Sequence, residues 1–119
     1  MRILAIGDSE RINALMYRLA EERGVIVDYA YDDPDLARRV MQRETYDLVV
    51  LEPDMPMEHA GEIARMLKGA ARNRCCIVAP RTDMIGYEKS DDGVDFVVST
   101  RPKRCLEAYR MFIEGRNDI

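Results

Sequence analysis

Acidic side chains follow two strand-like segments of the sequence, where carboxylates could bind a cation or act as nucleophiles. The stretch YDLVVLEPDMP (46–56) is an apolar run that ends on Glu52 and carries Asp54 two residues later. The stretch RILAIGD (2–8) is a second apolar run, and it ends on Gly7 and Asp8. In open parallel sheets, ligands bind at the edge where the strands end. The residues that follow the strands are therefore the first candidates for a functional site.

Apolar runs of strand length alternate with segments of helical period along the whole chain. The expected strands are 2–6, 25–31, 47–51, 75–79 and 94–98, and each of the first three is followed by a stripe of apolar residues at helical spacing. A further stripe after residue 101 predicts the last helix. Parallel pairing through right-handed crossovers then gives a doubly wound α/β fold, with a five-stranded parallel sheet as the middle of three layers. The segment PRTDMIGYEKSDDG (80–93) is short and polar, so the fourth helix is expected to be shortened.

Composition places limits on the class of protein. A chain of 119 residues with 47% hydrophobic and 34% charged residues fits one globular domain, 1–119. A formal net charge of −4 argues against binding nucleic acid through the overall field, and the short apolar run at the start is not a membrane span. Cys75, Cys76 and Cys105 show no disulfide or zinc spacing, which favours a reducing cytoplasm.

Three stretches carry a resemblance to a known family: RILAIGDSE, YDLVVLEPDMP and GVDFVVSTRP. In this order they resemble the receiver domain of bacterial response regulators, the flavodoxin-like (βα)5 module of two-component signalling, over essentially the whole chain. The resemblance implies a pair of magnesium-binding acids after the first strand and a phosphoacceptor aspartate after the third. It also implies a Ser or Thr after the fourth strand and a Lys-Pro step after the fifth.

The sequence departs from that pattern at four of the five functional positions. Gly7 stands at the first acid position and only Asp8 keeps its acid, so magnesium, which requires a near-octahedral oxygen shell, would be held poorly. Glu52 replaces the phosphoacceptor aspartate and is one methylene longer, and a misplacement of about 1 Å can cost on the order of a hundredfold in rate. Ala79 lacks the hydroxyl, and Arg101 stands at the lysine position. The resemblance is thus to a degenerate receiver, without catalytic residues, metal or cofactor.

Glu52 has two interpretations. It could mimic the phosphorylated aspartate, or it could be a structural partner of Arg101, whose planar guanidinium suits a carboxylate better than lysine does. The structural pairing of Arg101 with Glu52 or Asp8 is favoured, and the resemblance implies a cis Arg101–Pro102 peptide that directs the guanidinium inward. Asp54 could be a substitute acceptor, but a solvated loop acid is the favoured interpretation.

The expected function is that of a pseudo-receiver, not an enzyme, which acts by binding a protein partner such as a kinase, another receiver or an effector. The alternative is a working phosphoacceptor that uses Glu52 or Asp54 and that could be the N-terminal domain of a transcription regulator. The resemblance also implies a homodimer or partner surface on the fifth strand and fifth helix, with these candidate residues: Asp95, Lys103, Arg104 and Arg110. A solvated, mixed-charge helix face is the simpler interpretation of that surface. No contact with nucleic acid or membrane is expected.

Overall fold

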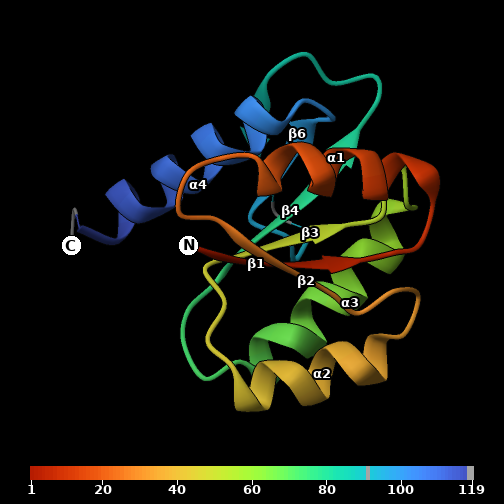
Figure 1. The fold of residues 1–119 in the computed structure, drawn as a ribbon, viewed down its shortest axis with the longest axis vertical. Coiled ribbons are helices and arrows are strands. Elements are labelled where there is room, and N and C mark those ends of the chain that lie inside the picture. Colours follow the sequence, from red (N-terminus) through yellow and green to blue (C-terminus); the bar gives the residue numbers. More distant parts are fainter. Residues whose placement is uncertain (91, 118–119) are drawn as a thin grey trace.

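The computed structural model describes residues 1–90 and 92–117 and contains, in that part of the chain, a mixed sheet flanked by helices (Figure 1). The strands are β1 (Arg2–Ile6), β2 (Ile26–Tyr29), β3 (Leu48–Leu51), β4 (Cys76–Arg81), β5 (Tyr87–Lys89) and β6 (Phe96–Ser99). The helices are α1 (Glu10–Ala20), α2 (Pro34–Arg43), α3 (Met57–Ala70) and α4 (Pro102–Asn117).

The strands of the sheet lie in the order β2-β1-β3-β4-β6-β5. All neighbours pair in parallel except β5, which runs antiparallel to β6. The chain leaves β1 first toward β2 and later returns to its other side as β3, so the direction of winding reverses between β1 and β3. The ends of these two strands carry Gly7 and Glu52, which places both at the reversal point.

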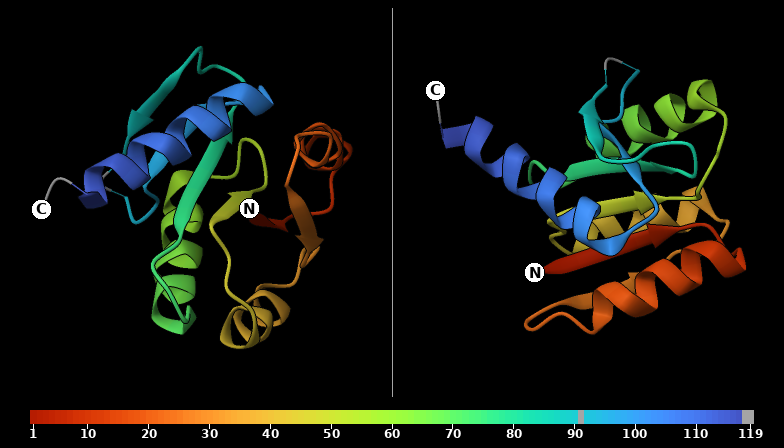
Figure 2. Two further views of the ribbon diagram at one scale, coloured as in Figure 1. Left: turned by 60° about the vertical axis from the view of Figure 1, so that its left-hand side comes forward. Right: turned by 90° about the horizontal axis from the view of Figure 1, so that it is seen from above.

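Helices cover both faces of the sheet, with α1 and α4 on one side and α2 and α3 on the other (Figure 2). The central strands are apolar on both faces because each face is buried; all four residues of β3 are inaccessible to solvent. Two clusters of buried side chains result, one under each helix layer. The prediction of an α/β fold with three layers is confirmed.

The first two helices begin where the sequence supplies a capping side chain. The Ser9 hydroxyl accepts a hydrogen bond from the amide of Ile12 (3.2 Å), and the Asp33 carboxylate accepts one from the amide of Leu36 (3.0 Å). Proline at position 34 occupies the first turn of α2, where its missing N–H costs nothing. These local signals fix the position of α1 relative to the loop that precedes it.

The prediction of a five-stranded, all-parallel sheet with a shortened fourth helix is wrong. Between β4 and β6 the described residues form no helix; instead β5 pairs with β6, Glu88 lying opposite Val97. The segment lacks an apolar stripe long enough to hold a helix against the sheet, so its backbone groups bond to the open edge of β6 instead. In the described part of the chain, none of the helices has both the length and the hydropathy needed to cross a membrane.

Candidate functional site

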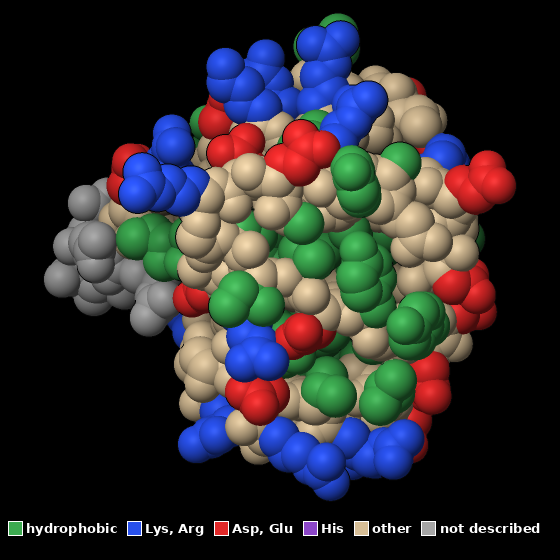
Figure 3. All heavy atoms as spheres, viewed as in Figure 1, with side chains coloured by type: hydrophobic (Ala, Val, Ile, Leu, Met, Phe, Trp, Pro, Cys, Tyr) green, Lys and Arg blue, Asp and Glu red, His purple; other side chains and the backbone are tan. Residues whose placement is uncertain are grey.

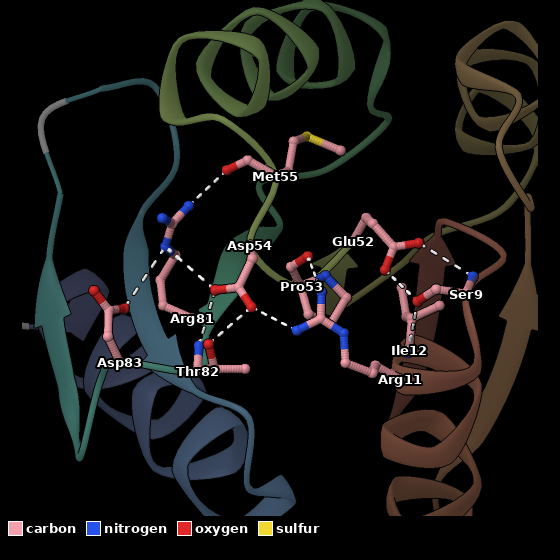
Figure 4. A network of polar contacts seen from close by, with 10 residues as sticks. All are labelled: Ser9, Arg11, Ile12, Glu52, Pro53, Asp54, Met55, Arg81, Thr82 and Asp83. Carbon is pink, nitrogen blue, oxygen red and sulfur yellow. Dashed lines mark hydrogen bonds and ion pairs between the residues drawn. The ribbon is translucent and has the colours of Figure 1, made fainter.

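Glu52 leaves the end of β3 and its side chain turns toward the start of α1 (Figure 4). Its Oε1 accepts a hydrogen bond from the Ser9 amide (3.1 Å), and its Oε2 accepts one from the Ser9 hydroxyl. Because the same hydroxyl caps α1, the Glu52 carboxylate is joined to the first turn of that helix through one serine. Both carboxylate oxygens are thus engaged by the protein itself.

The space that Glu52 occupies is the space that a side chain at position 7 would need. A Cβ added to Gly7 would lie 2.7 Å from Glu52 Oε1 and 3.0 Å from its Cβ. Gly7 also has φ +143°, a backbone conformation that L side chains rarely adopt, and its amide donates to the carbonyl of Tyr31 (2.7 Å). The glycine at position 7 and the longer acid at position 52 are therefore two parts of one packing arrangement.

Asp54 lies two residues further on, in left-handed backbone (φ +61°), and forms the centre of a second polar network. Its carboxylate accepts hydrogen bonds from the Thr82 amide (3.0 Å) and the Thr82 hydroxyl (2.9 Å), and Arg11 Nη1 lies 2.6 Å from Oδ2. The Asp54 amide donates to the carbonyl of Pro80 (3.0 Å). This one residue therefore connects the β3–α3 loop with the end of β4 and the first turn of α1 (Figure 4).

Two arginines hold the loop on either side of Asp54. Arg11 also donates to the carbonyl of Pro53 (3.2 Å), and Arg81 donates to the carbonyl of Met55 (2.6 Å). The Nε of Arg81 lies 3.8 Å from Asp54 Oδ1, which adds a second positive charge beside that carboxylate. The loop between β3 and α3 is thus anchored through the Asp54 side chain and through the carbonyl groups of Pro53 and Met55.

The environment of Asp54 favours its ionised form. The backbone N–H of Thr82 is the largest cause that lowers the pKa of this carboxyl, and hydrogen bonds from Arg11 and the Thr82 hydroxyl act in the same direction. Partial burial opposes them without reversing the shift. Asp54 therefore remains a carboxylate well into the acidic range.

The other predicted pocket residues do not join Glu52. Asp8 is exposed, and Ala79 is buried within β4, opposite Val97, in the core under α2 and α3. Arg101 is exposed and forms no ion pair with any described residue, so the predicted pairing with Glu52 or Asp8 is wrong.

The sequence explains where Arg101 lies instead. Strand β6 ends at Ser99, two residues before Arg101, and the Ser99 hydroxyl accepts a hydrogen bond from the Arg101 amide (3.1 Å). The peptide bond to Pro102 is trans, contrary to the cis prediction. Arg101 lines a groove with Tyr17 of α1 and with Glu21, the residue that follows the helix, whereas Glu52 contacts the residue before the helix start.

The residues proposed for a partner or dimer surface differ in how free they are to contact another protein. Lys103 and Arg110 are exposed on α4, and Arg104 pairs with Glu107 on the same helix (2.8 Å). Asp95 lies just before β6, where it pairs with Lys68 of α3 (3.1 Å) and accepts a hydrogen bond from the Ile77 amide (2.8 Å). Asp95 is therefore engaged inside the monomer.

Four residues of the site were missed at the level of sequence: Ser9 as a partner of Glu52, and Arg11, Arg81 and Thr82 as partners of Asp54. The signal that could have found the last two is the RTD triplet after the fourth strand, because β4 continues to Arg81 and carries Thr82 to the same edge as Asp54. Among the described residues, no group of three or more histidine, cysteine or acidic side chains could hold a metal ion.

The three cysteines lie apart from this site and are buried. Burial raises the pKa of Cys75 to about 11 and that of Cys105 to about 12, and it raises the pKa of Cys76 further. Thiols with such pKa values stay protonated and unreactive near neutral pH. The three thiols therefore add no reactive group to the site around Glu52 and Asp54.

No protein-family model matches the chain, and no curated protein matches it significantly. The function therefore has to be inferred from the arrangement of its own residues.

Proposed function

We propose that this chain is a degenerate receiver domain of flavodoxin-like type, which binds a protein partner in two-component signalling and is not phosphorylated at Glu52. The observation that carries the proposal is the position of the Glu52 carboxylate, which covers Gly7 and accepts both of its hydrogen bonds from Ser9. The protein's own side chain fills the place where a receiver would bind a divalent ion and a phosphoryl group.

Two consequences of this geometry act against phosphoryl transfer. Gly7 contributes no carboxylate, and a magnesium ion would have to replace the hydrogen bonds that Glu52 already forms with Ser9. An attacking oxygen must also lie in line with the phosphorus, and both Glu52 oxygens are held toward the start of α1 instead. A site closed in this way keeps one conformation, and the domain then acts as a constant binding surface rather than as a switch.

The partner class is a signalling protein such as a kinase, a receiver or an effector. Exposed cations on α4, including Lys103 and Arg110, form one surface that an acidic partner could contact. Binding that depends on a fixed surface needs no phosphorylation and no cofactor. The buried thiols of the domain are compatible with a reducing compartment such as the cytoplasm.

Incubation with acetyl phosphate and magnesium, followed by intact-mass measurement, tests the proposal. We expect no stoichiometric phosphoryl adduct on the wild-type protein or on Glu52→Asp, because shortening the acid does not restore the ligand missing at Gly7 or the hydroxyl missing at Ala79. Millimolar magnesium should raise the melting temperature very little, since a ligand stabilises only in proportion to its occupancy. An adduct on Glu52 would overturn the proposal.

A second candidate is phosphorylation at Asp54, and one observation favours it. Asp54 has the Thr82 hydroxyl and the guanidinium groups of Arg11 and Arg81 around an ionised carboxylate, which are groups suited to a phosphoryl acceptor. The same mass experiment on Asp54→Asn separates the candidates. An adduct on the wild type that disappears in Asp54→Asn would assign the domain as a working phosphoacceptor.

A further inference from the structure

Strand β2 forms one edge of the sheet and leaves backbone groups unpaired. It pairs with β1 in parallel, and the amides of Ile26 and Ala30 donate to the carbonyls of Met1 (2.8 Å) and Ala5 (2.9 Å). In a parallel pair, alternate residues bond to the same neighbour, so the N–H and C=O groups of Val27 and Tyr29 point away from β1. Within residues 1–90 and 92–117, nothing bonds to these outward groups.

Several apolar side chains around this edge are exposed, beside the ion pairs that Arg2 forms with Asp28 and Glu44. Ile26 is 60% exposed, Tyr31 is 58% exposed, and the rings of Tyr29 and Tyr31 stack with centroids 6.2 Å apart. Figure 3 views the molecule from the β2 side and shows hydrophobic side chains near the centre of this face, with charged groups between them and around them.

The other edge of the sheet also has outward backbone groups, but it is shorter and more charged. β5 has three residues, and two of them, Glu88 and Lys89, are charged and exposed. Short, charged edge strands are a common protection against edge-to-edge pairing. The unprotected edge is therefore β2, and a partner strand would both satisfy its backbone groups and cover its apolar side chains.

We propose that β2 is a homodimerisation strand, which pairs antiparallel with β2 of a second copy across a two-fold axis. With Val27 opposite Tyr29 of the second copy, each such pair exchanges its N–H and C=O groups, and symmetry repeats the pair. The same register places Val25 opposite Tyr31 and Ile26 opposite Ala30, so apolar side chains meet apolar side chains along the strand. The two sheets become one continuous sheet.

Charges at the two ends of β2 favour a second copy over an unrelated strand. Arg23 precedes the strand, Asp32 follows it, and both are exposed without a partner among the described residues. In this register position 23 lies opposite position 33 of the second copy, so Arg23 lies near the exposed acids Asp32 and Asp33, twice across the axis. At the centre, Asp28 lies opposite its symmetry mate, and each Asp28 carries its own cation because Arg2 Nε lies 2.9 Å from it.

The test is the dimerisation constant of the whole chain, measured by sedimentation equilibrium for the wild type and for Val27→Pro. The proline removes an outward N–H and no bond to β1, so the fold should be retained while dimerisation weakens by about tenfold or more. Lys89→Pro is the matched control, because the Lys89 amide also points outward but lies on the β5 edge, and it should leave the constant unchanged.

Swapping the charges at positions 23 and 32 tests the same interface without a proline that could affect folding. Arg23→Glu and Asp32→Arg should each weaken dimerisation, and the double variant should restore it, because both ends of the interface then regain opposite charges. A wild-type protein that stays monomeric to about 1 mM would overturn the proposal. So would a dimer that resists Val27→Pro, or one that responds to Arg110→Glu on α4 and not to these changes.

Discussion

Glu52 and Asp54 stand on either side of Pro53, and their environments differ completely. Glu52 turns toward the end of β1 and takes its hydrogen bonds from one residue, Ser9, with no cation within ion-pair distance among the described residues. Asp54 turns toward the end of β4 and contacts Thr82, Arg11 and Arg81. One acid fills a space near the helix start, whereas the other cross-links three segments of the chain.

The difference shows that two acids only two positions apart in the sequence need not have similar roles. Glu52 belongs to the packing of Gly7, because its atoms occupy the position of the missing side chain. Asp54 has an electrostatic role at the carboxyl ends of the strands, because the donors around it stabilise its ionised form. Each of the following measurements tests one side of this comparison.

The largest effect is expected from Gly7→Ala. The new Cβ would lie 2.7 Å from Glu52 Oε1 in backbone with positive φ, so steric overlap and backbone strain together should lower the free energy of unfolding by about 2–4 kcal/mol. Urea unfolding measures it. In a Glu52→Ala background the cost should be smaller, since the Glu52 carboxylate no longer opposes the methyl group. Equal losses of unfolding free energy in the two backgrounds would show that Gly7 and Glu52 are not coupled, contrary to the packing argument.

Asp54→Ala should come next, with a loss of about 1–3 kcal/mol, because it removes the acceptor for Thr82 and the partner of Arg11 together. Asp54→Asn should cost less, since asparagine keeps one acceptor oxygen and tolerates left-handed backbone. Thermal and urea unfolding of both variants provide the measurement. A neutral Asp54→Ala would mean that the network contributes nothing to stability.

The pH dependence of unfolding distinguishes the charge of Asp54 from its shape. The pKa of this carboxyl is lower in the folded protein than its ordinary value of 3.8, so the unfolded state binds the proton more readily. The contribution of Asp54 is therefore present above that value and is lost as the pH falls through the folded pKa. Between about pH 5 and pH 3, stability should fall less steeply in Asp54→Asn than in the wild type. Parallel curves would contradict the ionic role.

Glu52→Gln is expected to cost about 1 kcal/mol or less, because the amide keeps the volume and an acceptor for Ser9 while losing the charge. Equilibrium unfolding in urea gives this value. A larger loss than that of Asp54→Ala would reverse the comparison and would assign Glu52 an electrostatic role.

Arg101→Ala should have the smallest effect, within about 0.5 kcal/mol, as expected for an exposed side chain without an ion pair to a described residue. The same unfolding assay applies. A loss above about 1 kcal/mol would show that Arg101 contributes to the site in solution, as the sequence alone had suggested.

Much of this protein can be predicted from local patterns in its sequence. The apolar runs and helical stripes specify the parallel strands and the helices, because burial of one face or both faces imposes a period on the residues that form them. Ser9 and Asp33 mark helix starts for a reason that is equally local. The order of these elements was sufficient to place Gly7 and Glu52 at one edge of the sheet.

Which side chains reach the site depends on where each strand ends and on which segments lie opposite it, and only the tertiary structure determined this. β4 continues to Arg81 and so brings Thr82 to Asp54, whereas β6 stops at Ser99 and leaves Arg101 outside the site. The segment before β6 became a strand because the free edge of the sheet offered it hydrogen bonds. A short polar segment has no period of its own to fix its structure, and a charged side chain takes its partner from distant parts of the chain that only the folded arrangement brings within reach.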